Sequence, residues 1–172
     1  MSTKININVE GIDNVNNALK GIRNELKDFS IPLIKSGDYY IQEISQNFDE
    51  RGGRFGEVWS PLSDRRLKEK FNLYTEGKAI AIAKPLICTG WLQNSFNWLL
   101  RNKASMDIKS DAPYAELMHS GGMNSEGKMV PARTITKVDD ARETKVNNIF
   151  AEWLRNKINQ YIYQKWKQRY NF

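Results

Sequence analysis

The last part of the sequence carries apolar residues at helical spacing, and this pattern constrains the fold more than any other. The residues that follow the pattern are Val146, Ile149, Phe150, Trp153, Leu154, Ile158, Tyr161, Ile162 and Trp166. Their spacing predicts an amphipathic helix of about six turns. Asp139 and Asp140 lie at its start and basic residues lie toward its end, an order that suits the helix dipole at both termini.

Shorter patterns before this helix predict both strands and helices. Lys4–Val9 alternates polar and apolar residues, which is typical of a half-buried strand. Apolar residues between Val15 and Leu26 have helical spacing, and those between Leu33 and Phe48 predict a second, longer helix. Two further strands are predicted at Phe96–Leu100 and Ser105–Ser110.

These elements predict an α+β fold formed by one domain that spans residues 1–172. We expect a small antiparallel sheet packed by an N-terminal helix pair and the long C-terminal helix. The strand Lys4–Val9 and the strands within Phe96–Ser110 should share this sheet, with the final helix packed across it, because each apolar face needs cover.

Glycines and prolines mark the connections. Arg51–Gly56 contains three glycines in six residues and requires an irregular backbone. Asp64–Phe71 is predicted to form a short basic helix or turn, and Thr89–Ser95 a turn into a short helical segment. Pro113–His119 should form a short helix that ends at the glycine pair after it. Met123–Val130 is interpreted as a polar loop.

Composition limits the environment of the chain. No stretch approaches the roughly 20 apolar residues that a membrane span requires, and the N-terminus carries no apolar signal region. Cys88 is the sole cysteine and excludes an intramolecular disulfide. These features predict a protein that is made in a reducing cytosol and has no membrane partner. The formal net charge of +6 favours acidic partners or nucleic acid.

The sequence offers few groups for catalysis, cofactor binding or metal binding. His119 is the sole histidine, and no nucleophile signature surrounds it or Cys88. One histidine and one cysteine are too few for an ordinary zinc site, and the glycines near Gly52 do not match a phosphate-binding loop. We therefore expect no enzyme activity and no cofactor. A carboxylate-dependent hydrolase stays open as an alternative, because 20 acidic residues could converge in space.

Four short motifs follow one another through the middle of the chain. Phe48–Leu62 contains Arg-Gly-Gly-Arg and then Trp-Ser-Pro-Leu, and Leu86–Ser95 has the pattern Leu-x-x-Thr-Gly-x-Leu-x-x-Ser. Pro113–Gly122 contains Tyr-Ala, a histidine and two glycines, and Val130–Ile135 contains Pro-Ala-Arg. In this order, across roughly half the chain, they resemble the phage virion morphogenesis family, whose members are also described as tail completion proteins.

The residues that carry this resemblance are Trp59, Pro61, Leu62, Thr89, Gly90, Leu92, Ser95, Tyr114, Ala115, His119, Gly122, Pro131, Ala132 and Arg133. We interpret them as turn and packing devices. Thr89 can cap the segment that follows it. We expect His119, in the last turn of its helix, to hydrogen-bond a backbone carbonyl. The chain departs from the family after Arg133, where proline and phenylalanine usually follow.

The resemblance implies a structural protein of the virion neck, where the phage tail joins the DNA-filled head. Such proteins form rings, commonly six-fold, that complete the tail and enclose the DNA channel. The implied partners are further copies of the chain, other neck, connector and tail proteins, and channel DNA. The chain would be assembled in the cytoplasm of the bacterial host and reside in the virion.

Basic and aromatic residues supply the candidate interface. The candidates are Arg51, Arg54, Arg65, Arg66, Tyr161, Lys165, Trp166, Lys167, Arg169 and Tyr170. Those from Tyr161 onward lie in residues 153–172, which we interpret as the end of a docking helix, because no acidic residue follows Glu152. A solvated helix face is the alternative interpretation. A basic DNA-binding protein is the main alternative function, although no DNA-binding motif is present.

Overall fold

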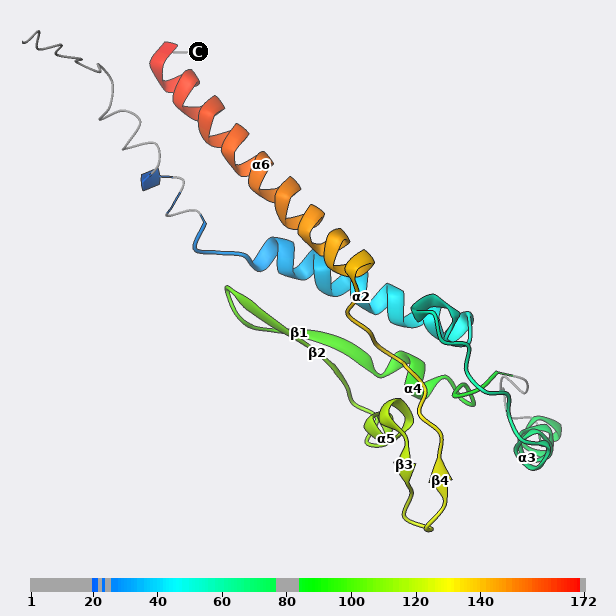
Figure 1. Ribbon diagram of the computed structural model, residues 1–172. Coiled ribbons are helices and arrows are strands. Elements are labelled where there is room, and N and C mark those ends of the chain that lie inside the picture. The colour runs from blue at the N-terminus through cyan, green and yellow to red at the C-terminus, as the bar shows by residue number, and fades with distance from the viewer. Residues whose placement is uncertain (1–19, 22, 24–25, 77–83, 171–172) are drawn as a thin grey trace, which may run out of the picture.

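The structure is a computed structural model that describes residues 20, 21, 23, 26–76 and 84–170. Helices combine with two antiparallel two-stranded sheets, so the predicted α+β class is confirmed. Figure 1 shows the elements in chain order: α2 (Ser30–Asp49), the 3-10 helix η1 (Gly53–Phe55), α3 (Asp64–Thr75), α4 (Trp91–Asn94), β1 (Phe96–Asn102), β2 (Ser105–Ser110), α5 (Ala115–Ser120), β3 (Gly122–Met123), β4 (Met129–Val130) and α6 (Asp140–Tyr170).

Helix α2 is the element on which the others are built, and it lies where the apolar pattern predicts a helix. It contacts the β1–β2 hairpin and also α6, and Figure 1 shows these elements on either side of it. Ile44 and Phe48 are fully buried on its core face. At its start, the side chain of Asp28 accepts a hydrogen bond from the backbone N–H of Ser30 (3.0 Å), which satisfies one donor of the first turn.

The β1–β2 hairpin forms at the positions of the two predicted strands. Its register pairs Trp98 with Ile108 and Leu100 with Met106. The indole N–H of Trp98 donates to the carboxylate of Asp38 in α2 over 2.9 Å, which ties the middle of β1 to the helix. The hairpin turn is tied as well, because the carbonyl of Lys103 accepts from the backbone N–H that precedes α2 (2.8 Å).

Helix α6 packs against the start of α2. The rings of Phe150 and Trp153 lie 6.1 and 5.4 Å from the ring of Phe29, and Trp153 is buried. We expected α6 to pack across the sheet. Its main partner is instead α2, which itself covers β1. The helix is so long that its second half extends past the hairpin (Figure 1).

Two other expectations change, and two more lie on residues that the structure does not describe. Helix α3 continues to Thr75, four residues beyond the predicted end at Phe71. The segment Met123–Val130, interpreted as a loop, forms most of a small hairpin in which β3 pairs with β4. The predicted strand Lys4–Val9 lies outside the described residues, as does most of the predicted helix from Val15 to Leu26.

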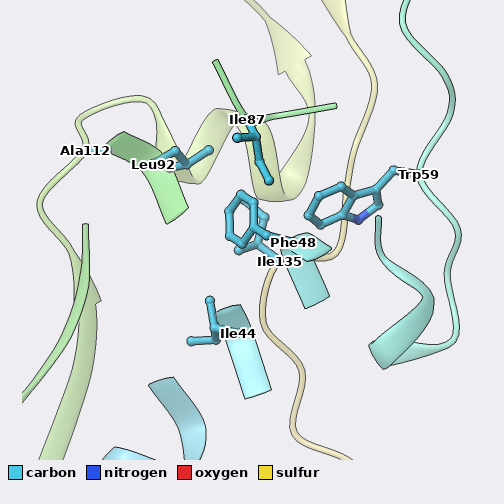
Figure 2. Packing of buried hydrophobic residues seen from close by; sticks show 7 residues of the cluster. All are labelled: Ile44, Phe48, Trp59, Ile87, Leu92, Ala112 and Ile135. Carbon is cyan, nitrogen blue, oxygen red and sulfur yellow. The ribbon is translucent and has the colours of Figure 1, made fainter. Parts of the chain in front are cut away.

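The core gathers side chains from separate segments around the end of α2. Figure 2 shows seven buried residues of this cluster: Ile44, Phe48, Trp59, Ile87, Leu92, Ala112 and Ile135. The rings of Phe48 and Trp59 meet edge to face, with centroids 5.3 Å apart. Burial of aromatic side chains contributes strongly to stability, and this geometry adds to it. The core therefore forms mostly from loop and helix-end residues, which α2 holds in place.

Gly37 provides a test of how closely α2 packs on the hairpin. A Cβ built at Gly37 would lie 2.6 Å from the ring of Trp98 and 2.8 Å from the sulfur of Met106. We predict that Gly37→Ala lowers the free energy of unfolding by about 1–3 kcal/mol, because overpacking outweighs the gain in helix propensity. Gly53→Ala is the matched control, since the nearest side-chain atom would lie 3.7 Å away. Urea denaturation of both variants is the measurement, and equal stabilities would contradict the packing.

Candidate functional site

The segment from Pro131 to Asp139 has no regular secondary structure, yet part of it is buried in the core. The side chain of Ile135 is 1% exposed. Buried backbone groups need hydrogen-bond partners, and here side chains supply them. The carbonyl of Thr134 accepts from the side-chain amide of Asn47 (2.9 Å) and from the indole of Trp59 (3.2 Å).

His119 satisfies the next backbone group of this segment. Its Nδ1 accepts a hydrogen bond from the backbone N–H of Ile135 over 3.1 Å. The expected partner, a backbone carbonyl, is therefore wrong, because His119 acts as an acceptor. Two residues before Ile135, the backbone N–H of Arg133 donates to the carbonyls of Met118 and His119 at the end of α5 (3.1 Å each). These bonds satisfy carbonyl groups that a helix C-terminus leaves without intrahelical partners.

The structure brings all four motifs together at this segment. Trp59 and Leu92 are buried beside Ile135, and Figure 2 shows their side chains converging on it. Tyr114 and Ala115 pack against the same cluster. The motif residues thus form one packing unit, although they come from positions far apart in the sequence.

Backbone geometry explains the glycines of the motifs. Gly90 has a φ of 83°, a left-handed conformation, and starts α4. Gly122 has a φ of 134° at the start of β3. A Cβ on Gly121, which ends α5, would lie 2.6 Å from the backbone nitrogen of Ala132, so only glycine allows this approach. The N-cap of α4 is Gly90, which has no side-chain cap, and the Thr89 hydroxyl before it accepts a long hydrogen bond from the N–H of Trp91 (3.4 Å).

The remaining motif residues lie at the surface or at its edge. Pro61, Pro131 and Ala132 are exposed, whereas Leu62 is half-buried. Ser95 is buried, and its hydroxyl donates to the carbonyl of Leu92 over 2.8 Å.

A cluster of charges joins α2, η1 and α6, with Glu43 and Arg142 buried and Arg54 exposed at its edge. The carboxylate of Glu43 contacts Arg54 (2.6 Å) and Arg142 (2.9 Å), and Arg142 also binds Asp139 (2.6 Å). The Arg142 guanidinium lies 4.4 Å from the centre of the Phe55 ring. Burial alone would raise the pKa of Glu43, but the hydrogen bonds and charges of the two arginines outweigh it and lower this pKa.

This cluster includes Arg54, one of the candidate interface residues, although its side chain is 37% exposed. The other basic candidates of the middle segment are exposed as well. Arg65 and Arg66 both bind Glu69, at 3.0 and 2.9 Å. Arg51 is exposed and has a φ of 54°, so its backbone is held in the left-handed region by the turn after α2.

The second half of α6 presents two different faces. Tyr161 is half-buried, and a Cβ on Gly21 would lie 2.6 Å from its hydroxyl, so this side faces the N-terminal part of the chain. Ile162 and Trp166 are 58% and 51% exposed. At about 100° per residue, Ile162 points roughly 180° away from Trp153. The predicted single stripe is therefore wrong, because these two residues lie on the opposite face.

The other candidates of this helix follow the same division. Lys165 lies with its Nζ 5.8 Å from the centre of the Tyr161 ring, and Lys167 is exposed. Arg169 and Tyr170 belong to the last turn of α6, and their side chains lie outside the description.

The described residues set limits on the chemistry. Within them, no group of three or more histidine, cysteine, aspartate or glutamate side chains is placed to hold a metal ion. No helix of the described segments combines the length and apolarity that a membrane crossing needs. Sequence reasoning missed Asn47, Glu43 and Arg142, since polar residues within an amphipathic helix carry no signal for burial.

Comparisons with known proteins give no relative. No family model matches the chain, and no curated protein and no solved structure is detectably similar to it.

The charge cluster gives a pH-dependent prediction. We expect Glu43→Gln to lower the free energy of unfolding at pH 7 by about 3 kcal/mol or more, because Arg142 loses a buried partner. Since the folded pKa of Glu43 lies below its ordinary 4.5, its contribution is present above that pH and is lost as pH falls through the folded pKa. Denaturation between roughly pH 7 and pH 3 should give a flatter profile for the variant.

Glu69→Gln is the control for this prediction, because it removes an exposed carboxylate that also binds two arginines. Exposed ion pairs contribute little, so its cost should stay below about 1 kcal/mol. If both variants lose the same stability, the Glu43 cluster does not stabilise the fold as described.

Proposed function

We propose that this chain is a structural protein of the phage neck, which forms a ring that completes the tail and joins it to the head around the DNA channel. The order of the four motifs supports the proposal. The observation that carries it is their convergence on residues 131–135, where they contribute packing and backbone hydrogen bonds. Residues used in this way shape a rigid subunit, as an assembly protein requires.

A ring needs two different contact surfaces on each subunit, because closed cyclic symmetry uses heterologous interfaces. The exposed face of α6 is our candidate for one of them. Ile162 and Trp166 are one turn apart, and Tyr163, which is 63% exposed, lies beside them. Large apolar side chains that a subunit exposes together favour protein contacts. Positive residues around them would orient the helix on an acidic partner.

The test of the proposed function is the mass of the purified chain in solution, measured together with its retention on DNA at low and high salt. A neck protein should form a closed oligomer or join a ring when neighbouring neck proteins are present, and should bind DNA weakly. Tight, salt-dependent DNA retention by a monomer would favour the DNA-binding alternative and contradict the proposal.

The exposed face of α6 gives a prediction about assembly. Ile162→Ser combined with Trp166→Ser should reduce the yield of joined particles at least tenfold when the variant replaces the wild-type chain during phage growth, because central aromatic anchors carry much of the binding energy. Plaque counts and electron microscopy of the lysate are the measurements.

The matched control combines Gln160→Ser with Gln164→Ser, which places the same residue type at other exposed positions of α6. Both double variants should melt within a few degrees of each other, since all four exchanged side chains are exposed. Equal particle yields from the two variants would refute the docking role of this face.

A further inference from the structure

A second surface feature has no role in the proposal above. It is a groove of about 570 Å³ between α3, the chain before α4, the end of α5 and the β3–β4 hairpin. We call it the α3–β4 groove. Its polar lining includes Arg65, Arg66, Lys70, Lys128 and Arg133. Figure 1 shows α3, α5 and the β3–β4 hairpin on the side of the fold away from α6.

Arg133 is the most informative residue of the groove. Its Nε is buried and has no hydrogen-bond partner, and its guanidinium makes one long hydrogen bond, to the carbonyl of Pro131 (3.4 Å). None of the ion pairs of the described residues involves it. Arg133 is half-buried, and this partial burial lowers its pKa. A cation that loses part of its hydration is costly unless it is paired.

The charges around Arg133 leave the groove positive. Five cationic side chains line it, and Glu69 and the nearby Glu126 are the acids that pair with Arg65, Arg66 and Lys128. Lys70 is 2% exposed, and its ammonium group donates to the carbonyls of Lys84 and Ile87. The groove therefore attracts an anion, and Arg133 offers the fork of donors that a carboxylate fits.

Apolar side chains form the rest of the lining, and they indicate what kind of anion fits. These side chains are Leu62, Leu92, Met118, Met129 and Val130. Met129 is 74% exposed at the edge strand β4. A phosphate of nucleic acid would leave these apolar walls uncovered. A peptide would cover them with its own side chains while one carboxylate meets the guanidinium.

We propose that the α3–β4 groove binds an acidic segment of a partner protein, in which a carboxylate pairs with Arg133 and flanking apolar residues cover the walls. The inference stands apart from the neck assignment, because it depends on an unpaired cation and not on the motif resemblance. In a ring or a stacked assembly, such a groove would supply a contact that differs from the exposed face of α6.

The test uses the full chain and a fluorescein-labelled peptide of alternating leucine and glutamate, with the glutamine version of the same peptide as its control. We expect saturable binding by fluorescence anisotropy for the glutamate peptide and at least tenfold weaker binding for the glutamine peptide. The Nε–H signal of Arg133 in an NMR spectrum should shift with the first peptide. Absence of saturable binding, or equal affinities, would overturn the proposal.

Two variants separate binding from structure. Arg133→Met should weaken binding of the glutamate peptide at least tenfold. It should leave the melting temperature unchanged or higher, because it removes a half-buried charge that has no carboxylate partner among the described residues. Lys145→Met removes one exposed positive charge from α6 and should bind like the wild type.

If Arg133→Met unfolds, the affinities of the two peptides for the wild-type chain still decide whether the groove binds an acidic segment.

Inorganic phosphate is the last ligand tested in the experiment. A shift of the Arg133 signal by phosphate that matches the peptide's would identify a general phosphate site and overturn the proposed acidic segment.

Discussion

The carbonyl oxygen of Thr134 is the point on which this fold depends. It accepts hydrogen bonds from Asn47 in α2 and from Trp59 in the chain before α3. The neighbouring N–H of Ile135 binds His119 of α5. An irregular segment can pass through an apolar core only when its polar backbone groups have partners. Three side chains from three separate segments meet that requirement here, and the Trp59 ring packs with the Ile135 side chain in the core.

The consequence is a fold in which an irregular segment is held in the core by hydrogen bonds. Glu43, Arg54, Arg142 and Asp139 extend this effect from the core to the start of α6. Buried ion pairs of this kind add little net stability, but they penalise any arrangement that separates the partners. The direction in which α6 leaves the body is therefore set by charge as well as by the packing of Trp153 on Phe29. A long helix held at a fixed angle suits a protein that contacts others at a distance from its own core.

Local patterns predicted the elements, and long-range contacts explain where the predictions fail. The apolar spacing in α2 and α6 reports directly on helical geometry, so both helices were predicted close to their observed bounds. The sequence does not show that Trp153 and Ile162 lie on opposite faces of α6. Other apolar residues stand between them, so the helical pattern looks continuous. The strands β3 and β4 have two residues each, too few for a period to show.

The sequence motifs single out Trp59, Leu92 and His119. In the structure Trp59 and Leu92 lie in one cluster, and His119 binds the segment that passes through it. Sequence could not show that His119 accepts from a backbone group 16 residues away, or that Arg133 has no carboxylate partner among the described residues. Both facts depend on how segments approach one another, and neither leaves a local pattern.

The central claim is that the chain works as a structural part that joins heads to tails. It is tested most directly by electron microscopy of particles from cells in which the phage grows without a functional copy of the gene. The account predicts filled heads and finished tail tubes that lie separate, and joined particles when the wild-type chain is restored. Complete, infectious particles formed in the absence of the chain would contradict it.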